Sequence, residues 1–134
     1  MSQQPVLAAS VVVRDGRGRI LLVQRGHEPN KGRWSLPGGK AQAGEDLAAT
    51  AARELWEETG LRGEVGRELG VVEVASVRTY EIHVFRAQVP AGHPVAGDDA
   101  ADVGWFGRQE LANLLLTDHL VEQLDEYGVL DSGP

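Results

Sequence analysis

The sequence contains no cysteine among its 134 residues. This absence excludes a disulfide framework and a thiolate metal site, and a reducing compartment would suit the chain. No apolar run approaches the length that crosses a bilayer, and the N-terminal segment lacks the positive charge of a secretory signal. We therefore expect a cytoplasmic protein that is not targeted to a membrane.

Positive charge is also scarce, with 13 Lys and Arg against 20 Asp and Glu, for a formal net charge of -7. This balance opposes nonspecific binding to a nucleic acid polymer or to an anionic membrane surface. A phosphate-bearing ligand would need local help, such as a metal ion held by carboxylates. The positions of the acidic residues are therefore more informative than their number.

The pattern of apolar, glycine and proline residues predicts a single α/β domain with a mixed sheet over residues 1–134. Two apolar runs on either side of a turn-forming stretch, 15–18, predict a β-hairpin. Strands are predicted at residues 6–13, 20–24, 71–77, 80–89 and 102–106. An amphipathic helix is predicted near the C-terminus, at residues 111–127. Loops are expected at 26–33 and 90–101, with a sharp turn at 37–39 and a disordered tail at 131–134.

Residues 45–59 are predicted to form one helix, because they combine Ala, Leu, Glu and Arg without Gly or Pro and are followed by Gly60 as a C-cap. On this helix Glu54, Glu57 and Glu58 share an arc of roughly 100° beside the apolar face. Their mutual repulsion would raise their pKa values, and a divalent cation would remove that cost. In isolation such a cluster is more often a solvated face, here with Arg53 bridging to Glu57.

The surrounding residues favour the metal site. Residues 39–61 read GKAQAGEDLAATAARELWEETGL, which spaces Gly, Glu, Arg-Glu-Leu, Glu-Glu and Gly-Leu by five, seven, one and one residues. This segment resembles the Nudix box at every specified position, and the Trp-x-Leu-Pro-Gly-Gly stretch before it is also similar to that family. The resemblance implies an α/β/α sandwich with a mixed sheet.

The resemblance also implies a site for Mg²⁺ or Mn²⁺. Carried over by position, Glu54, Glu57 and Glu58 are the expected metal ligands, together with the carbonyl of Gly39, and all are oxygen donors that suit a hard cation. Arg53 is expected to orient a glutamate by a bidentate ion pair, and Glu45 to tie the loop to the helix; both could equally be structural.

Two glycines and one loop complete the expected reaction site. Gly38 and Gly39 would let the backbone approach metal or phosphate, although a turn ahead of a helix is the alternative. The general base that activates water would be Asp98 or Asp99 in the 90–101 loop, or else Glu57 or Glu58. The residues alone do not choose between them.

Outside the box, three residues are candidates for substrate contacts or structural roles. Arg25 could contact phosphate or be a solvated strand-end residue. Trp34 could stack on a base, although a Trp beside an apolar strand is usually in the core. His83 is expected to be a structural histidine.

The resemblance implies hydrolysis of the pyrophosphate bond of a nucleoside diphosphate linked to another moiety, with a small-molecule nucleotide as substrate. Residues 97–106 are weakly similar to ADP-ribose pyrophosphatases, so ADP-ribose or a similar nucleotide sugar is the first candidate. The alternatives are sanitation of oxidised triphosphates such as 8-oxo-dGTP and a non-catalytic nucleotide-binding module, which the intact box glutamates count against. A homodimer is one candidate assembly, but no interface pattern supports it.

Overall fold

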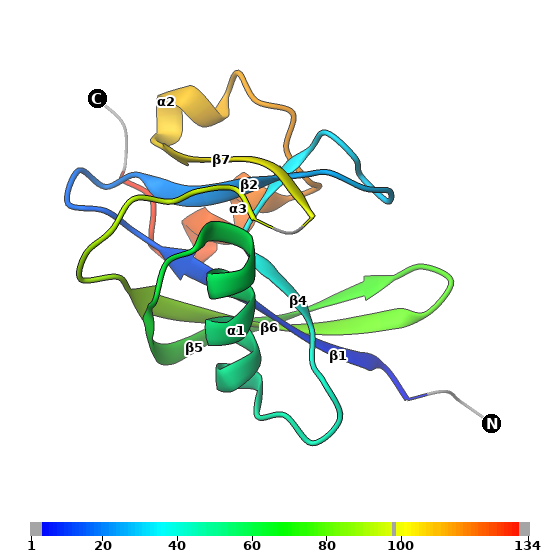
Figure 1. The fold of residues 1–134 in the computed structure, drawn as a ribbon. Helices are drawn as coiled ribbons and strands as arrows, with labels where there is room; N and C mark the ends of the chain where they lie inside the picture. Colours follow the sequence, from blue (N-terminus) through cyan, green and yellow to red (C-terminus); the bar gives the residue numbers. More distant parts are fainter. Residues whose placement is uncertain (1–3, 98, 132–134) are drawn as a thin grey trace.

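The computed structural model describes residues 4–97 and 99–131 and contains two β-sheets flanked by helices (Figure 1). The first sheet is mixed, with a parallel β1–β6 pair between two antiparallel edge strands. Its order is β4 (Gly38–Lys40), β1 (Val6–Val13), β6 (Thr79–Gln88) and β5 (Glu64–Ala75). The second sheet is antiparallel, in the order β3 (Trp34–Ser35), β2 (Ile20–Arg25) and β7 (Ala100–Phe106).

Helices cover both faces of the mixed sheet, which confirms the expected α/β class. The helix α1 (Leu47–Thr59) packs on one face, and α3 (Leu120–Glu126) packs on the other beside β2 and the short α2 (Arg108–Leu111). Strand β1 is buried from both sides, since Val11 belongs to the core beneath α1 and Val12 to the core beneath α3. Burial on two faces explains why the strand is a continuous apolar run instead of an alternating one.

The hairpin expected from β1 and β2 is wrong, although its turn is present. The amide of Asp15 donates to the Arg19 carbonyl at 2.9 Å, and the Asp15 carboxylate accepts from the Arg19 amide. Beyond the turn the two strands are bridged only at Arg14 and Ile20 within the described residues, and they then enter different sheets. Each strand pairs with partners from elsewhere in the chain, a preference that local turn residues do not reveal.

The helix α1 has the expected end and a slightly later start. Asp46 is its N-cap, with a side-chain oxygen that accepts from the Ala48 amide at 3.3 Å, so Glu45 lies just outside the helix. Gly60 ends the helix in the left-handed conformation, with φ of 71°. Leu55 is fully buried and fixes the helix against the mixed sheet.

Two other expectations need correction. The sharp turn expected at 37–39 is confined to a bend at Pro37, because Gly38 and Gly39 lie in β4 and pair with β1. The C-terminal helix spans only Leu120–Glu126, since the preceding segment runs alongside β3, where the Thr117 amide donates to the Trp34 carbonyl at 3.0 Å. The pairing expected for 71–77 and 80–89 is confirmed in the antiparallel β5–β6 ladder.

The predicted disordered tail falls partly outside the described residues, which end at Asp131. Asp131 itself is held by two contacts, because its carboxylate pairs with Arg14 and its carbonyl accepts from Arg108. None of the helices in the described ranges combines the length and hydrophobicity that a bilayer crossing requires.

Removal of the Leu55 side chain should loosen the helix that carries the acidic residues. We expect Leu55→Ala to lower the free energy of unfolding by about 2–5 kcal/mol, because it leaves a cavity between α1 and the sheet. The matched control is Leu115→Ala, at a residue that is 58% exposed, where the loss should stay below about 1 kcal/mol. Urea unfolding followed by circular dichroism measures both, and equal losses would contradict the packing role of Leu55.

Candidate active site

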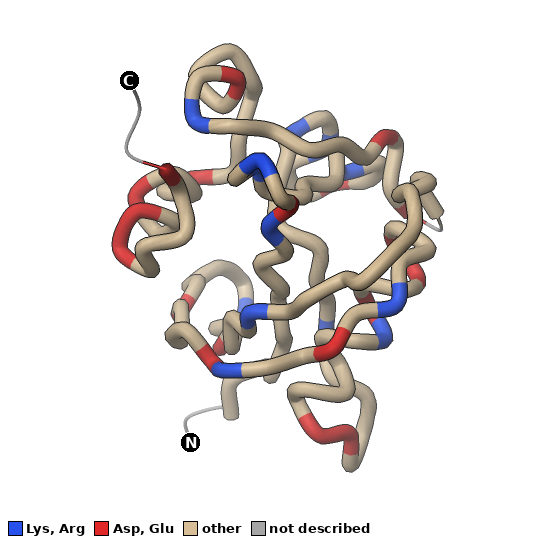
Figure 2. The backbone as a smooth tube through the Cα atoms, turned by 90° about the vertical axis from the view of Figure 1, so that its left-hand side faces the viewer, with Lys and Arg blue, Asp and Glu red and all other residues tan. Residues whose placement is uncertain are grey.

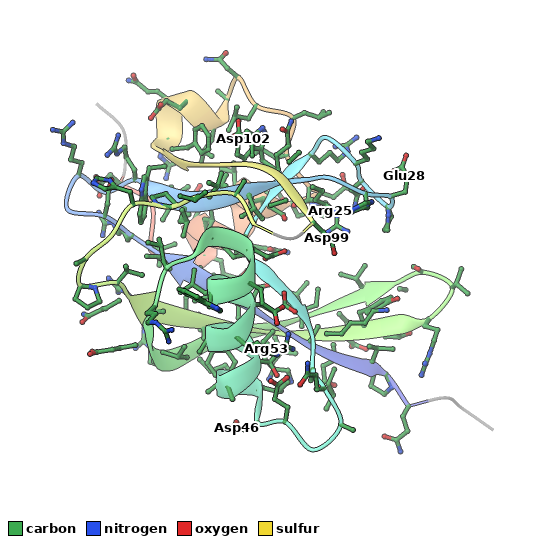
Figure 3. The ribbon with its side chains drawn as sticks, viewed as in Figure 1. Arg25, Glu28, Asp46, Arg53, Asp99 and Asp102 are labelled. Carbon is green, nitrogen blue, oxygen red and sulfur yellow. The ribbon has the colours of Figure 1, made fainter. Side chains whose placement is uncertain are left out.

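The side chain of Arg53 is the centre of a polar cluster between α1 and the segment that leads into it (Figure 3). Its Nε and one terminal nitrogen donate to the two carboxylate oxygens of Glu45, at 2.8 and 3.0 Å. The other terminal nitrogen donates to Glu54 at 3.0 Å and to Glu57 at 3.1 Å. The carbonyl of Lys40 accepts a further bond at 3.0 Å. The bidentate pair expected of Arg53 is therefore formed with Glu45.

Glu45 ties the loop to the helix, as expected. Besides Arg53, its carboxylate accepts from the Gln42 amide at 3.0 Å and from the hydroxyl of Thr50 at 2.8 Å. The hydrogen bonds from Arg53 and then from the Gln42 amide lower the pKa of Glu45 to about 2. Thr50, which sequence reasoning did not select for this role, is fully buried and lies one turn before Glu54 on the same side of α1.

Glu54 lies against the backbone of β4. A Cβ built on Gly39 would come within 2.5 Å of the Glu54 carboxyl group, so only glycine leaves room for this contact. Burial raises the pKa of Glu54, and the neighbouring Glu57 raises it further, while Arg53 opposes both. In the structure it is the Glu54 carboxylate that lies against Gly39, and the expected approach to a metal or phosphate stays a prediction.

Glu58 has the most strongly raised pKa among the carboxyl groups of the box. Its pKa is raised to about 7, mainly by burial and further by repulsion from Glu54 and Glu57. The amide of Gly38 donates to it at 2.8 Å, and the positive charge of Arg25 also acts on it; both lower the pKa. Arg25 therefore lies near enough to the box to interact with it, which the sequence left open.

The oxygen donors of this cluster fit a hard divalent cation, because the carboxylates repel one another and two of them are partly desolvated. Over residues 4–97 and 99–131, however, no three acidic or histidine side chains converge into a formed metal site. The reason is that Arg53 binds Glu54 and Glu57, while the Gly38 amide binds Glu58. The expected ligands therefore share one side of the helix without surrounding a common point.

The loop before β7 is attached to the C-terminal end of α1. The amides of Val95 and Gly97 donate to the carbonyls of Thr59 and Glu58, at 2.9 and 3.0 Å. A Cβ on Gly97 would lie 2.5 Å from the carbonyl of Glu57, so this residue also needs to be glycine. Sequence reasoning missed this attachment, which brings the loop with Asp99 to the acidic end of the helix.

Of the two candidates for the general base in this loop, the structure describes Asp99. Asp98 lies outside the described residues. Asp99 extends into solvent with a side chain that is 83% exposed, and its carboxylate is 3.2 Å from Nε2 of His27. Figure 3 places Asp99 close to Arg25, in agreement with the β2–β7 ladder, in which Arg25 pairs with Ala100.

Two expected roles outside the box can now be assessed. Trp34 is buried in the core, where its ring packs edge to face on Phe106 with 4.9 Å between the ring centroids, in agreement with the core alternative and not with stacking on a base. His83 bridges Glu68 and Glu81, at 2.5 and 2.7 Å, on the β5–β6 ladder. Although partial burial opposes it, hydrogen bonds to these carboxylates raise the pKa of His83, in keeping with the expected structural role.

Basic residues are dispersed over the described chain. In Figure 2 the Lys and Arg positions occur mostly singly among acidic ones, and α3 together with the residues around it is acidic. The acidic balance of the chain opposes nonspecific binding to a polymer of phosphates.

Replacement of Arg53 by lysine should break the polar cluster while keeping the charge. Lysine has a single ammonium group and cannot donate hydrogen bonds to Glu45, Glu54 and Glu57 at the same time with the planar geometry of a guanidinium group. We expect Arg53→Lys to lower the free energy of unfolding by about 2–4 kcal/mol, because partly buried carboxylates lose their partner. Arg17→Lys, at an exposed turn residue, is the control and should change little. Chemical denaturation tests this, and identical stability of the two variants would count against the cluster.

The raised pKa of Glu58 predicts an unusual pH dependence of stability in the presence of chelator. Because the folded-state pKa is above the ordinary value, the contribution of Glu58 is fully present below about pH 4.5 and is lost as pH rises through about 7. The loss is at most about 3 kcal/mol. We therefore expect Glu58→Gln to be more stable than the parent at pH 8, with a smaller difference at pH 5.

The melting temperature of both proteins between pH 5 and 8 measures this effect. Magnesium at pH 8 should raise the melting temperature of the parent more than that of Glu58→Gln. Glu64→Gln, at an exposed position of β5, serves as the control. Parallel pH profiles for the parent and Glu58→Gln would show that burial of this carboxyl group has no energetic cost.

Comparison with known proteins agrees with the site and the fold. The chain is 37% identical over 120 residues to a putative 8-oxo-dGTP diphosphatase 2 of Mycobacterium tuberculosis, covering 83% of this chain and 78% of the relative. It is 36% identical over 113 residues to an ADP-ribose pyrophosphatase of Methanocaldococcus jannaschii, covering 82% and 66%. A crystal structure of a MutT NUDIX hydrolase from Burkholderia pseudomallei superposes with a TM-score of 0.79 at 29% identity, covering 92% of this chain and 98% of the other.

The sequence model of the NUDIX domain matches residues 4–126, which include both sheets and α1. Enzymes of this family generally require a divalent metal. With the box helix, the mixed sheet and these relatives in agreement, the chain belongs to the Nudix hydrolase family.

Proposed function

We propose that this Nudix hydrolase cleaves the pyrophosphate bond of a nucleoside diphosphate linked to another moiety, with ADP-ribose or a similar nucleotide sugar as the first candidate. The observation that carries the proposal is the set of box carboxylates gathered on one side of α1 beside the backbone of β4. Without a cation, the repulsion between these carboxylates is unfavourable. A bound cation would remove it and would also bind the phosphates of a substrate.

Glu54, Glu57 and Glu58, with the carbonyl of Gly39, would hold Mg²⁺ or Mn²⁺. A cation bound there would neutralise charge on the phosphates and lower the pKa of a coordinated water. The contribution of Arg53 is to keep Glu54 and Glu57 side by side despite their like charge. Arg25, whose charge already acts on Glu58, would contact a substrate phosphate at the same place.

For the general base we propose Asp99. The hydrogen bonds of Val95 and Gly97 to the end of α1 support this role, because they hold the loop of Asp99 next to the box. The carboxylate is exposed and able to exchange protons with solvent. The box glutamates, in contrast, are already committed to Arg53, Gly38 and the proposed cation. Asp99→Asn should then reduce turnover by roughly 10²–10⁴-fold.

Two of the relatives support different substrates. The Methanocaldococcus protein is named an ADP-ribose pyrophosphatase, whereas the Mycobacterium protein is named a putative 8-oxo-dGTP diphosphatase, at nearly the same identity. Oxidised nucleoside triphosphates are therefore the second candidate class. A purely nucleotide-binding role is less consistent with the complete set of box glutamates, since binding without turnover does not need them.

The test is product formation from ADP-ribose, NADH, nucleotide sugars, dinucleoside polyphosphates and 8-oxo-dGTP, each with Mg²⁺, with Mn²⁺ and with chelator. We expect metal-dependent release of AMP and ribose 5-phosphate from ADP-ribose. Glu58→Gln should lower this turnover by orders of magnitude while the fold is retained, because it removes a charged oxygen ligand near the surface. Glu64→Gln is the matched control.

Each other outcome has a defined meaning. Release of pyrophosphate from 8-oxo-dGTP, with ADP-ribose left intact, would replace the first substrate class with the second. Binding of a nucleotide without turnover of any substrate would contradict the proposed hydrolysis. Unfolding of Glu58→Gln would contradict the assignment of this residue to the reaction site.

A further inference from the structure

Two loops that are distant in sequence meet beside the box. Residues 26–33 follow β2, and residues 90–99 precede β7, so the β2–β7 ladder brings their ends together. The amide of Gly26 donates to the carbonyl of Asp99 at 3.0 Å. A Cβ on Gly26 would lie only 2.4 Å from that carbonyl oxygen, so the two backbones approach as closely as glycine permits.

The side chains of the residues on either side of this junction are also in contact. Nε2 of His27 is 3.2 Å from Oδ1 of Asp99, while the other side of the Asp99 carboxylate is open, in keeping with its 83% exposure. An imidazole N–H can donate to a carboxylate in both the neutral and the charged form of the ring. The two groups are within ion-pair distance, so the contact can limit the orientations of the Asp99 carboxylate.

We propose that His27 is a positioning residue for Asp99. This inference rests on the proposed function, in which Asp99 accepts the proton of the attacking water. The backbone bond at Gly26 sets the place of the Asp99 main chain, and the imidazole then holds one carboxylate oxygen so that the other is presented to the reaction. Loop 26–33 thereby contributes to the rate through Asp99.

The size of the expected effect distinguishes this role from that of a base. The pair is exposed on both sides, with His27 71% exposed. An exposed pair of this kind shifts the equilibrium between the bound and unbound orientations of the Asp99 carboxylate by at most about fivefold. A general base, in contrast, contributes roughly 10²–10⁴-fold. His27→Ala should therefore reduce kcat by about threefold to fivefold, with KM little changed.

A double-mutant cycle with the full chain is the decisive experiment. In the Asp99→Asn background, His27→Ala should cause no further loss of kcat, because the residue through which it acts is already disabled. His27→Gln should keep kcat within about twofold of the parent, since its amide N–H can replace the imidazole donor. The control is His119→Asn. His119 is similarly exposed and is paired with Glu122. Its φ of 65° is one that asparagine tolerates.

Three kinetic results would overturn the proposal. Equal losses from His27→Ala in both backgrounds would show that His27 acts independently of Asp99. A loss above about a hundredfold would make His27 itself the base. Full activity of His27→Ala would show that the contact has no catalytic effect.

Amide hydrogen exchange tests the contact without turnover. His27→Ala should speed exchange of the Gly26 amide by about the same factor by which it lowers kcat, and His27→Gln should not. Unchanged exchange in His27→Ala would contradict the positioning role. If exchange responds as expected but no nucleotide is hydrolysed, the proposed function fails while the contact between the loops stands.

Discussion

The guanidinium group of Arg53 is the interaction on which the rest of the site depends. Its five N–H donors lie in one plane, and the structure supplies an acceptor for each direction, from Glu45, Glu54, Glu57 and the Lys40 carbonyl. Because these acceptors come from the loop and from successive turns of α1, a single side chain joins the loop to the helix. It also supplies the positive charge that lets two carboxylates lie together before any cation is bound.

The backbone of the same helix organises the opposite side of the site. The last carbonyls of a helix have no partner within it, and in α1 those of Glu58 and Thr59 accept bonds from the loop before β7. That loop leads directly into the strand that pairs with the end of β2, where Arg25 is found. One helix thus presents carboxylates with its side chains and positions a loop and a strand end with its main chain.

Sequence reasoning succeeded where the controlling interactions are local. The end of α1 at Gly60 and the shared arc of Glu54, Glu57 and Glu58 follow from helix geometry alone, so they could be predicted. The strand at Gly38 and Gly39 could not, because it depends on pairing with β1. The separation of β1 from β2 and the contact of His27 with Asp99 likewise depend on distant segments.

The electrostatics of Glu58 connect the overall charge of the chain with its reaction. This carboxyl group is partly buried next to Glu54 and Glu57, and only Arg25 and the Gly38 amide oppose the resulting rise in its pKa. Near neutral pH the group is therefore close to the point at which a cation and a proton compete for it. Because ionised Glu58 is costly in the absence of a cation, a divalent ion that binds it relieves strain as well as gaining oxygen ligands. An acidic protein would in this way attract phosphates at one place, since an ion held as proposed by the box carboxylates would reverse the sign of the local charge there.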